Sequence, residues 1–298
     1  MYNPFSTKNQ PDKTDELLIA ASLEGDKSSL EELIQRHESW IYNICVRMVG
    51  NTADAADLTQ EILIKVVTSL ATFQHKSSFR TWLYRIVKND VINWGKKKAR
   101  FRVNTFTELA HALDNAQDIE ITASDSFAAD NDTLINETKF RCMTGMLLCL
   151  DKTQRLIFIL GELFEVSDTV GSEIMEISKV NFRVLLSRAK EQLYSFMNEK
   201  CGLENKNNPC RCARKTKAFI AEGFVDPKKL LFAIGHKLAI EEVVESRQGE
   251  MEQLLSEKYQ ALYQKHPFLS SSGMADFLKE VLSSEQVVKT FNFKSNNN

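Results

Sequence analysis

The sequence lacks the features that identify most enzymes, membrane proteins and exported proteins. It contains no Gly-rich phosphate loop and no His-Glu metalloprotease spacing, and only 5 of its 298 residues are histidine. No apolar run approaches the roughly 18 residues that a membrane-spanning helix needs. The opening text, MYNPFSTKNQPDKTDE, has no apolar signal core. We therefore expect a protein that is not an enzyme, does not insert into membranes and stays in the cytoplasm.

The chain is long enough for two or three domains, and its hydrophobic content of 43% supports packed cores. The formal net charge of −2 conceals a strong local asymmetry, because residues 103–138 hold eight carboxylates and no Lys or Arg. Such a segment, rich in Asn, Ser and Thr, is typical of a solvated linker.

A helix is expected from Asp54 onward. Apolar residues recur at spacings of four, four, four and three, which places them on one helical face. They are Leu58, Ile62, Val66, Leu70 and Phe73. Four polar residues share a second face. They are Asp54, Asp57, Gln60 and Glu61. Two interpretations stay open: a surface for a cationic partner, or a solvated face whose acids are favoured by the helix N-terminus.

A basic segment rich in aromatic residues follows. Between residues 85 and 102 there are seven cations and one acid, Asp90. The cations are Arg85, Lys88, Lys96, Lys97, Lys98, Arg100 and Arg102. Cations neutralise phosphates, and exposed aromatic faces can stack on unpaired bases, so the segment suits nucleic acid. The residues expected in the core are Phe79, Leu83, Ile86 and Trp94. Trp82 suits the core and a base platform equally well.

Together these segments resemble region two of bacterial RNA polymerase sigma factors, particularly the extracytoplasmic-function (ECF) group. The text that carries the resemblance is DAADLTQEILIKVVTSLATFQHKSSFRTWLYRIVKNDVINWGKKK. The resemblance implies that the acidic helix binds RNA polymerase, and that the next loop and helix bind the single-stranded −10 promoter element. The residues implied to face polymerase are Asp54, Asp57, Gln60 and Glu61. Those implied to face DNA are His75, Lys76, Ser77, Arg80, Trp82, Arg85 and Lys88.

A second pair of helices is expected at residues 167–174 and 178–197. In the second helix apolar residues repeat at four, three and four, and Ser178 suits the N-cap position. Those apolar residues are Phe182, Leu186, Ala189 and Leu193. Polar residues on the other face suit a DNA major groove. They are Lys179, Asn181, Arg183, Arg188 and Lys190. The pattern alone fits a helix-turn-helix and a plain helical hairpin equally well.

This part of the chain resembles sigma region four, which implies a reader of the duplex −35 element. The similar stretches are LDKTQR from Leu150, EIMEIS from Glu173 and LSRAK from Leu186. Two positions depart from the family pattern: Gly171 replaces a core aliphatic residue, and Val184-Leu185 replaces a Ser-Arg pair. The same resemblance offers a second interpretation of residues 103–138, as a linker threaded through polymerase channels.

With no secretory signal, the six cysteines are expected as reduced thiols. The three in apolar helical patterns are expected as small core residues. They are Cys45, Cys142 and Cys149. The other three lie in a polar, turn-rich stretch. They are Cys201, Cys210 and Cys212. Three interpretations stay open for this group: a structural zinc site whose fourth ligand would be His236, a redox-sensitive pair, or inert thiols.

Residues beyond 200 form an extension that short ECF factors do not have. The stretch PCRCARKTKAFIAEGFVDPKKLLFA resembles an extension of some Bacteroidetes-type members. Helices are expected at residues 215–233 and 239–265, the second with an apolar stripe. The stripe comprises Leu254, Leu255, Tyr259, Leu262 and Tyr263. We hypothesise that this extension restrains or stabilises region four.

The sequence thus predicts an all-α protein of four parts. They are region two (12–100), an acidic linker (101–135), a region-four helix-turn-helix (136–200) and a helical extension (201–298). The predicted function is that of a sigma factor directing promoter recognition and melting. The implied partners are core RNA polymerase and promoter DNA, with an anti-sigma factor as a third to be tested. The alternative is a conventional helix-turn-helix regulator with an N-terminal effector or dimerisation domain.

Overall fold

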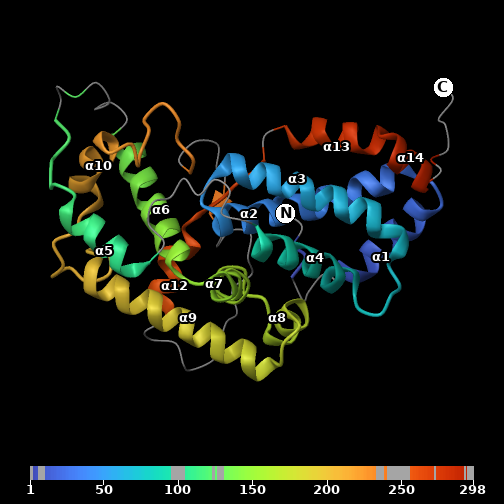
Figure 1. Cartoon of the computed structure of the whole chain (residues 1–298), viewed down its shortest axis with the longest axis horizontal. Helices are drawn as coiled ribbons and strands as arrows, with labels where there is room; N and C mark the ends of the chain where they lie inside the picture. The colour runs from blue at the N-terminus through green and yellow to red at the C-terminus, as the bar shows by residue number, and fades with distance from the viewer. Residues whose placement is uncertain are drawn as a thin grey trace.

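The computed structural model describes residues 3–5, 11–94, 105–122, 125, 131–232, 238–239, 256–271, 273–291 and 293. Its regular structure is almost entirely helical, as the sequence predicted (Figure 1). Within these residues the exceptions are two-residue strands, β1 (Leu238–Ala239) and β2 (Pro267–Phe268), which pair antiparallel. None of the described helices is long and apolar enough to cross a membrane.

The N-terminal helices are built around the long helix α2. Their bounds are α1 (Pro11–Leu23), α2 (Lys27–Val49), α3 (Thr52–Ser69), the 3-10 turn η1 (Leu70–Thr72) and α4 (Phe79–Asn93). Polar caps set the boundaries, because Asp26, Asn51 and Ser78 accept hydrogen bonds from orphan backbone N–H groups. The apolar face predicted for residues 58–73 is buried, which confirms that part of the sequence analysis.

The middle of the chain contains the predicted helix pair. Its elements are α5 (Phe106–Asn115), α6 (Asn131–Cys149), α7 (Lys152–Phe158), the π-helical turn η3 (Ile159–Leu163), α8 (Asp168–Met175) and α9 (Lys179–Lys200). Ser178 caps α9 by accepting from the Asn181 N–H at 3.1 Å, as predicted. Gly171 lets α8 approach α9 closely, since a Cβ there would lie 2.4 Å from the Phe182 ring. An aliphatic residue at this position would clash.

The prediction of a solvated linker is wrong for residues 106–116. Thr105 caps α5 by accepting from the Glu108 N–H at 3.1 Å, and Leu109 and Leu113 are buried against α6. Their spacing of four forms a short apolar stripe, and its burial offsets the charge that made the segment look solvated. Residues 101–104, 123–124 and 126–130 lie outside the described residues.

The C-terminal part differs from the two helices that we expected there. Its helices are α10 (Cys212–Ala221), α12 (Ser256–Gln264), α13 (Met274–Ser283) and α14 (Glu285–Phe291). The expected helix 215–233 ends at Ala221, and Gly223 follows in the left-handed conformation (φ 72°). The expected helix 239–265 is wrong at its start, because Ala239 pairs with Pro267 as strand, and residues 240–255 lie outside the described residues.

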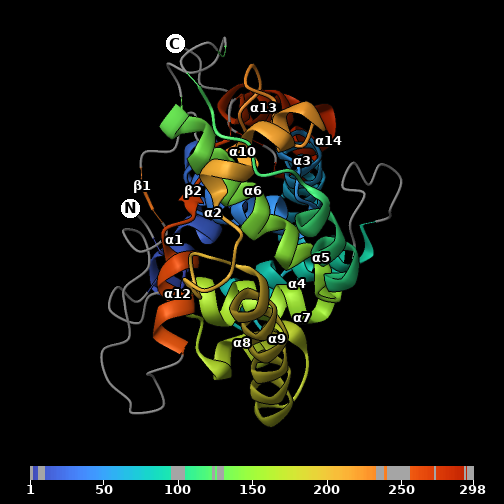
Figure 2. The ribbon, with the colours of Figure 1, turned by 90° about the vertical axis from the view of Figure 1, so that its left-hand side faces the viewer.

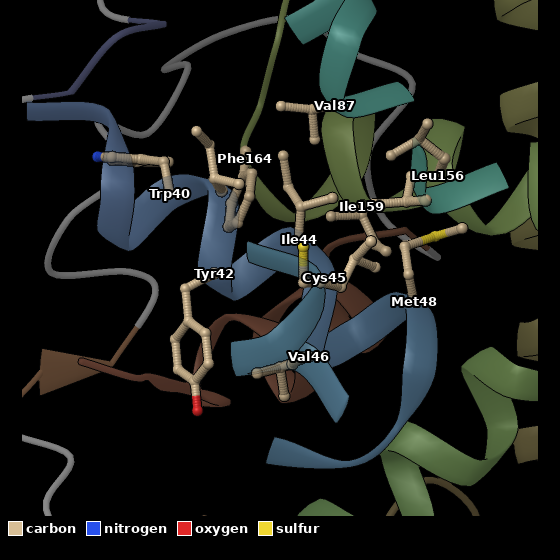
Figure 3. Close-up of a cluster of buried hydrophobic side chains, with 14 of the residues drawn as sticks. Trp40, Tyr42, Ile44, Cys45, Val46, Met48, Val87, Leu156, Ile159 and Phe164 are labelled. Carbon is tan, nitrogen blue, oxygen red and sulfur yellow. The ribbon is translucent and has the colours of Figure 1, made fainter. Parts of the chain in front are cut away.

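The three parts of the chain share one hydrophobic core. Figure 3 shows side chains of α2, α4, α7 and η3 meeting in one cluster, with Val87, Leu156 and Ile159 around Ile44. From the C-terminal part, α13 and α14 run beside α2 and α3 (Figures 1 and 2). The described helices therefore form one packed body, in which the regions that the sequence separates are in contact.

Candidate nucleic-acid interface

The acidic face of α3 is available at the surface. Asn51 fixes the start of the helix by accepting from the N–H groups of Ala53 (2.9 Å) and Asp54 (3.0 Å). Asp57 and Glu61 are exposed, and Gln60 is half-buried. Among the described residues, no Lys or Arg forms an ion pair with any carboxylate of this face. Within the part of the chain that the structure describes, these acids therefore have no compensating cation, as expected of a surface for a cationic partner.

An aliphatic side chain extends this acidic face. Ile64 is 42% exposed and lies three and four positions after Glu61 and Gln60, on the same side of α3. Its exposure was not predictable from the sequence, because its position in an apolar-rich helix gave no sign of it. The exposed part of α3 therefore carries an aliphatic group beside its acid and amide groups.

The loop before α4 presents two of the predicted DNA contacts. His75 has a left-handed backbone (φ 53°), and its ring packs against Phe73 at 4.5 Å between centroids. Lys76 is exposed and Ser77 is half-buried. Arg80, in contrast, donates from Nη1 to the carbonyl of Pro4 at 3.0 Å. One of the cations predicted to contact DNA is thus hydrogen-bonded to the N-terminal residues.

Trp82 lies at the edge of the core. Its ring packs against Phe73 and Phe79, at 5.3 and 5.7 Å between centroids. The residue is nevertheless only half-buried, whereas Phe79 and Leu83 are fully buried. One side of the indole therefore belongs to the core, and part of the side chain is accessible from solvent.

The cations farther along α4 face α8. Arg85 donates from Nε to the Glu173 carbonyl at 2.8 Å, and the Lys88 ammonium lies 2.5 Å from Oε2 of Glu176. The hydrogen bond from Lys88 lowers the pKa of Glu176 below its usual value of 4.5. Glu176 also ends α8 with a left-handed backbone (φ 58°), which turns the chain toward α9. The last cations of the predicted basic segment, Lys96 to Arg102, lie outside the described residues.

The outer face of α9 divides into available and engaged side chains. Lys179, Asn181 and Arg188 are exposed. Arg183 is exposed but paired with Asp168 of α8. Lys190 lies 2.8 Å from the buried carboxylate of Glu162, so its charge is engaged within the protein.

The cysteine cluster is not arranged as a metal site. Cys201 and Cys210 face each other in an isolated parallel β-bridge, and Cys212 begins α10. In the described part of the chain, however, no three His, Cys, Asp or Glu side chains are placed to hold a metal ion. The zinc prediction is therefore not supported, and its proposed fourth ligand, His236, lies outside the described residues.

An arginine organises this turn instead. Arg211 donates to the carbonyls of Cys210 (3.0 Å) and Lys206 (2.7 Å). Gly202 makes room for it, since a Cβ there would lie 1.9 Å from Nη1 of Arg211. Burial raises the pKa of Cys212 to about 12, which disfavours the thiolate that metal binding and oxidation need.

One further thiol joins the cluster from α6. The thiol of Cys142 interacts electrostatically with Cys201, Cys210 and Cys212, although it is about sixty residues earlier in the sequence than the first of them. Burial raises the pKa of Cys142 well above its ordinary value. Sequence spacing gave no sign that these thiols lie near one another, because α6 and α10 become neighbours only in the folded chain.

Comparisons with known proteins bear on the family of the chain. Residues 19–101 match the family model described as Sigma-70 region 2. The chain is 29% identical over 175 residues to the RNA polymerase sigma factor YlaC of Bacillus subtilis, covering 58% of this chain and 94% of that protein. It is 28% identical over 180 residues to the ECF RNA polymerase sigma-E factor of Haemophilus influenzae, covering 60% of this chain and 93% of that protein.

A solved structure was also found. The structure of CnrH in complex with the cytosolic domain of CnrY aligns with a TM-score of 0.44 and 19% identity, covering 62% of this chain and 98% of that chain. At this score the alignment supports no further conclusion. The sequence relatives span nearly their own full lengths and leave about two fifths of this chain unmatched, in agreement with an extension. The chain belongs to the extracytoplasmic-function family of RNA polymerase sigma factors, which are not enzymes and which bind RNA polymerase in transcription initiation.

Proposed function

We propose that this sigma factor binds core RNA polymerase through the acidic face of α3 and reads promoter DNA with two separate surfaces. In this proposal the loop before α4, together with Trp82, Arg85 and Lys88 of α4, captures the single-stranded −10 element. The pair α8–α9 acts as the region-four helix-turn-helix and reads the duplex −35 element. The observation that carries the proposal is the exposed acid and amide face of α3, which has no cationic partner among the described residues.

The polymerase surface follows from the chemistry of α3. Asp57, Gln60 and Glu61 offer carboxylate and amide groups on a helix whose opposite face is fixed in the core by Leu58 and Ile62. A rigid helix loses little conformational freedom when it binds, so its polar groups can form charge-assisted hydrogen bonds at low entropic cost. The face would dock on a basic surface of the polymerase.

The two proposed DNA surfaces suit different forms of DNA, one duplex and one single-stranded. Lys179, Asn181 and Arg188 project from one face of a capped helix, which suits a major groove. Trp82, Arg85 and Lys88 combine a partly accessible indole with two cations, which suits an unpaired strand. The domain bounds 12–100 and 136–200 belong to this proposal, as does the location, since a sigma factor acts where the polymerase is, in the cytoplasm.

The test is binding of core polymerase by a double variant, Asp57→Ala with Gln60→Ala. Because both side chains lie opposite the core, thermal unfolding should stay within about 1 °C of the original protein, as for most surface substitutions. The affinity for core polymerase should fall at least about tenfold, which corresponds to roughly 1.4 kcal/mol. Binding is measured by pull-down and by biolayer interferometry.

A matched control removes an acid and an amide from another surface. Glu31→Ala with Gln35→Ala breaks an exposed hydrogen bond of 3.0 Å on α2 and leaves α3 untouched. This control should bind polymerase like the original protein. Equal affinity of the two double variants would remove the basis for placing polymerase on α3.

A further inference from the structure

A cavity of about 740 Å³ lies where the C-terminal part meets α5 and α6. Both α5 and α10 lie beside α6 (Figures 1 and 2). The walls of the cavity are mainly apolar. They include Leu109 and Leu113 of α5, Phe219 of α10, and Phe224 and Leu231 of the segment after α10. The volume falls within the ~300–1,000 Å³ that is usual for pockets that bind small organic molecules.

A glycine in the middle of α6 keeps this space open. Gly145 is buried and lines the cavity, yet a Cβ on it would meet no side chain or neighbouring element within 4 Å among the described residues. Glycine inside a helix is less stable than alanine, so its presence there calls for a structural reason. The open space over Gly145 belongs to the cavity, which is the reason that the structure offers.

Two other helical glycines show the contrast. At Gly161 a Cβ would lie 2.8 Å from Cδ2 of Leu186. At Gly171 it would lie 2.4 Å from the Phe182 ring. Both glycines therefore allow close packing of helices, whereas Gly145 borders a space that the described residues leave unfilled.

Arg141 supplies a cation to the wall, one turn before Gly145 on α6. Its Nε donates to Oε1 of Glu137 at 2.6 Å, and its Nη2 donates to the Lys229 carbonyl at 3.3 Å. Glu137 is fully buried and also accepts from two backbone N–H groups of the C-terminal part. These bonds hold the guanidinium in one orientation. In the described part of the chain, Nη1 of Arg141 has no acceptor, although the side chain is only 11% exposed.

The charges around the cavity favour an anion. Glu222 is the carboxylate among the described lining residues, and it is exposed to solvent, where its charge is screened. The guanidinium of Arg141 is nearly buried, so a hydrogen bond between it and an anionic group is screened much less.

We propose that this cavity binds a small organic anion with an apolar body, whose carboxylate pairs with Arg141 while its body packs against the walls from α5 and α10. The inference goes beyond the proposed function and does not depend on it. It gives a role to Phe219 and Phe224, which belong to the extension. Asn51, which caps α3, also lines the cavity, so the bound molecule would lie beside the start of that helix.

The test uses the full-length protein and the probe 1-anilinonaphthalene-8-sulfonate, which combines aromatic rings with one anionic group. Its affinity is measured by fluorescence titration. Gly145→Leu should fill the cavity from α6 and weaken binding at least about tenfold, because the apolar body loses its place. Gly145→Ala adds only a methyl group and is the matched control, with an affinity within about twofold of the original protein. Unchanged affinity in Gly145→Leu would overturn the site.

Stability distinguishes blocking of the cavity from loss of the fold. Gly145→Ala should raise the melting temperature by about 2–4 °C, because alanine favours the helix. Ala112→Trp fills the cavity from α5 and covers the case that Gly145→Leu fails to fold. Its control is Ala20→Trp, at an exposed position of α1. Ala112→Trp should weaken probe binding about fivefold or more relative to Ala20→Trp, and equal affinities would contradict the site.

Displacement of the probe tests the charge of the occupant. The competitors are 2-naphthoate and 2-naphthamide, which have similar shapes and differ in charge. The carboxylate should displace the probe at a concentration about fivefold lower than the amide, because a hydrogen bond between two charged groups is stronger than one to a neutral acceptor. Equal potency would overturn the anionic class. Neither polymerase nor DNA is present in these assays, so their failure is distinct from failure of the proposed function.

Discussion

The cations of α4 and those of α9 look alike in the sequence and differ in the fold. Both helices carry Lys and Arg on the face that does not contribute to their own core. On α4, Arg85 and Lys88 are held by oxygen atoms of α8, whereas on α9, Lys179 and Arg188 are exposed. A basic pattern in the sequence therefore shows where a phosphate could bind but not whether the site is available. Four experiments test this difference.

The largest effect is expected from release of a strap, residues 263–269 of the C-terminal part, whose Leu269 backbone is hydrogen-bonded to Asn43 of α2. Asn43→Ala removes both hydrogen bonds to Leu269 and the one that Nη1 of Arg47 donates to Oδ1 at 2.8 Å, all in a fully buried site. Buried groups left without partners cost about 1–3 kcal/mol each, so the free energy of unfolding should fall by about 3 kcal/mol. Urea denaturation followed by circular dichroism measures this change.

The control for Asn43→Ala is Asn136→Ala, at an exposed position of α6. It should change the free energy of unfolding by less than about 0.5 kcal/mol. If Asn43→Ala lowers the free energy of unfolding no more than the control does, the strap does not stabilise the packing of α2.

The next largest effect concerns the available surface. Arg188→Ala should weaken binding of duplex DNA by the free protein about fivefold and lower the salt slope by about one, because it removes one phosphate contact. Arg214→Ala on α10, also exposed, is the matched control. Electrophoretic mobility shifts at several salt concentrations make the comparison. Equal losses for the two variants would mean that α9 acts only through general charge.

Arg85→Ala should have a smaller effect in the free protein. Since Arg85 already donates to the Glu173 carbonyl, its removal should change DNA affinity by less than about twofold. In the polymerase complex the same variant should impair strand opening, measured as lost permanganate reactivity of −10 thymines. A strong loss of DNA binding by the free protein would show that Arg85 is available to DNA despite its hydrogen bond to Glu173.

The smallest effect is a dependence on pH. The pKa of Glu176 is lowered by the hydrogen bond from Lys88, so the pair stabilises the fold fully above the unfolded value of 4.5. That contribution is lost as the pH falls through the lowered pKa of the folded state. Because Glu176 is half-exposed, solvent screening keeps the contribution small. Carbon-13 NMR titration should give a midpoint below 4.5, and Lys88→Gln should move it back toward 4.5.

Local patterns predicted the elements that carry the proposed contacts. The periodic apolar residues of α3 and α9 gave both helices and their buried faces, because each face repeats within a few residues. The Ser178 cap was predictable for the same reason. Gly171, a departure from the family pattern, was explained only by the fold, where the Phe182 ring lies against it.

Contacts between distant segments could not be predicted. The strap is polar at Gln264 and His266, and its burial depends on partners in α2 and α6 that no local pattern announces. The α5 helix was not predicted, because the acidic composition of residues 103–138 indicated a solvated linker. Cys142 was predicted as a core residue, and its approach to the later cysteines depends on the packing of α6 against α10. In each case the missing information was the tertiary partner.

The position of the strap in the chain has a consequence for timing. Asn43 and Leu269 are 226 positions apart. At a synthesis rate of ~5–20 residues per second, roughly 10–45 s separate the appearance of the two partners on the ribosome. During that interval α1 to α4 are complete and can fold, while the segment that fastens them does not yet exist. A nascent chain therefore passes through a period in which α2 lacks the strap. The finished protein returns to that state only if the hydrogen bonds between α2 and the strap break.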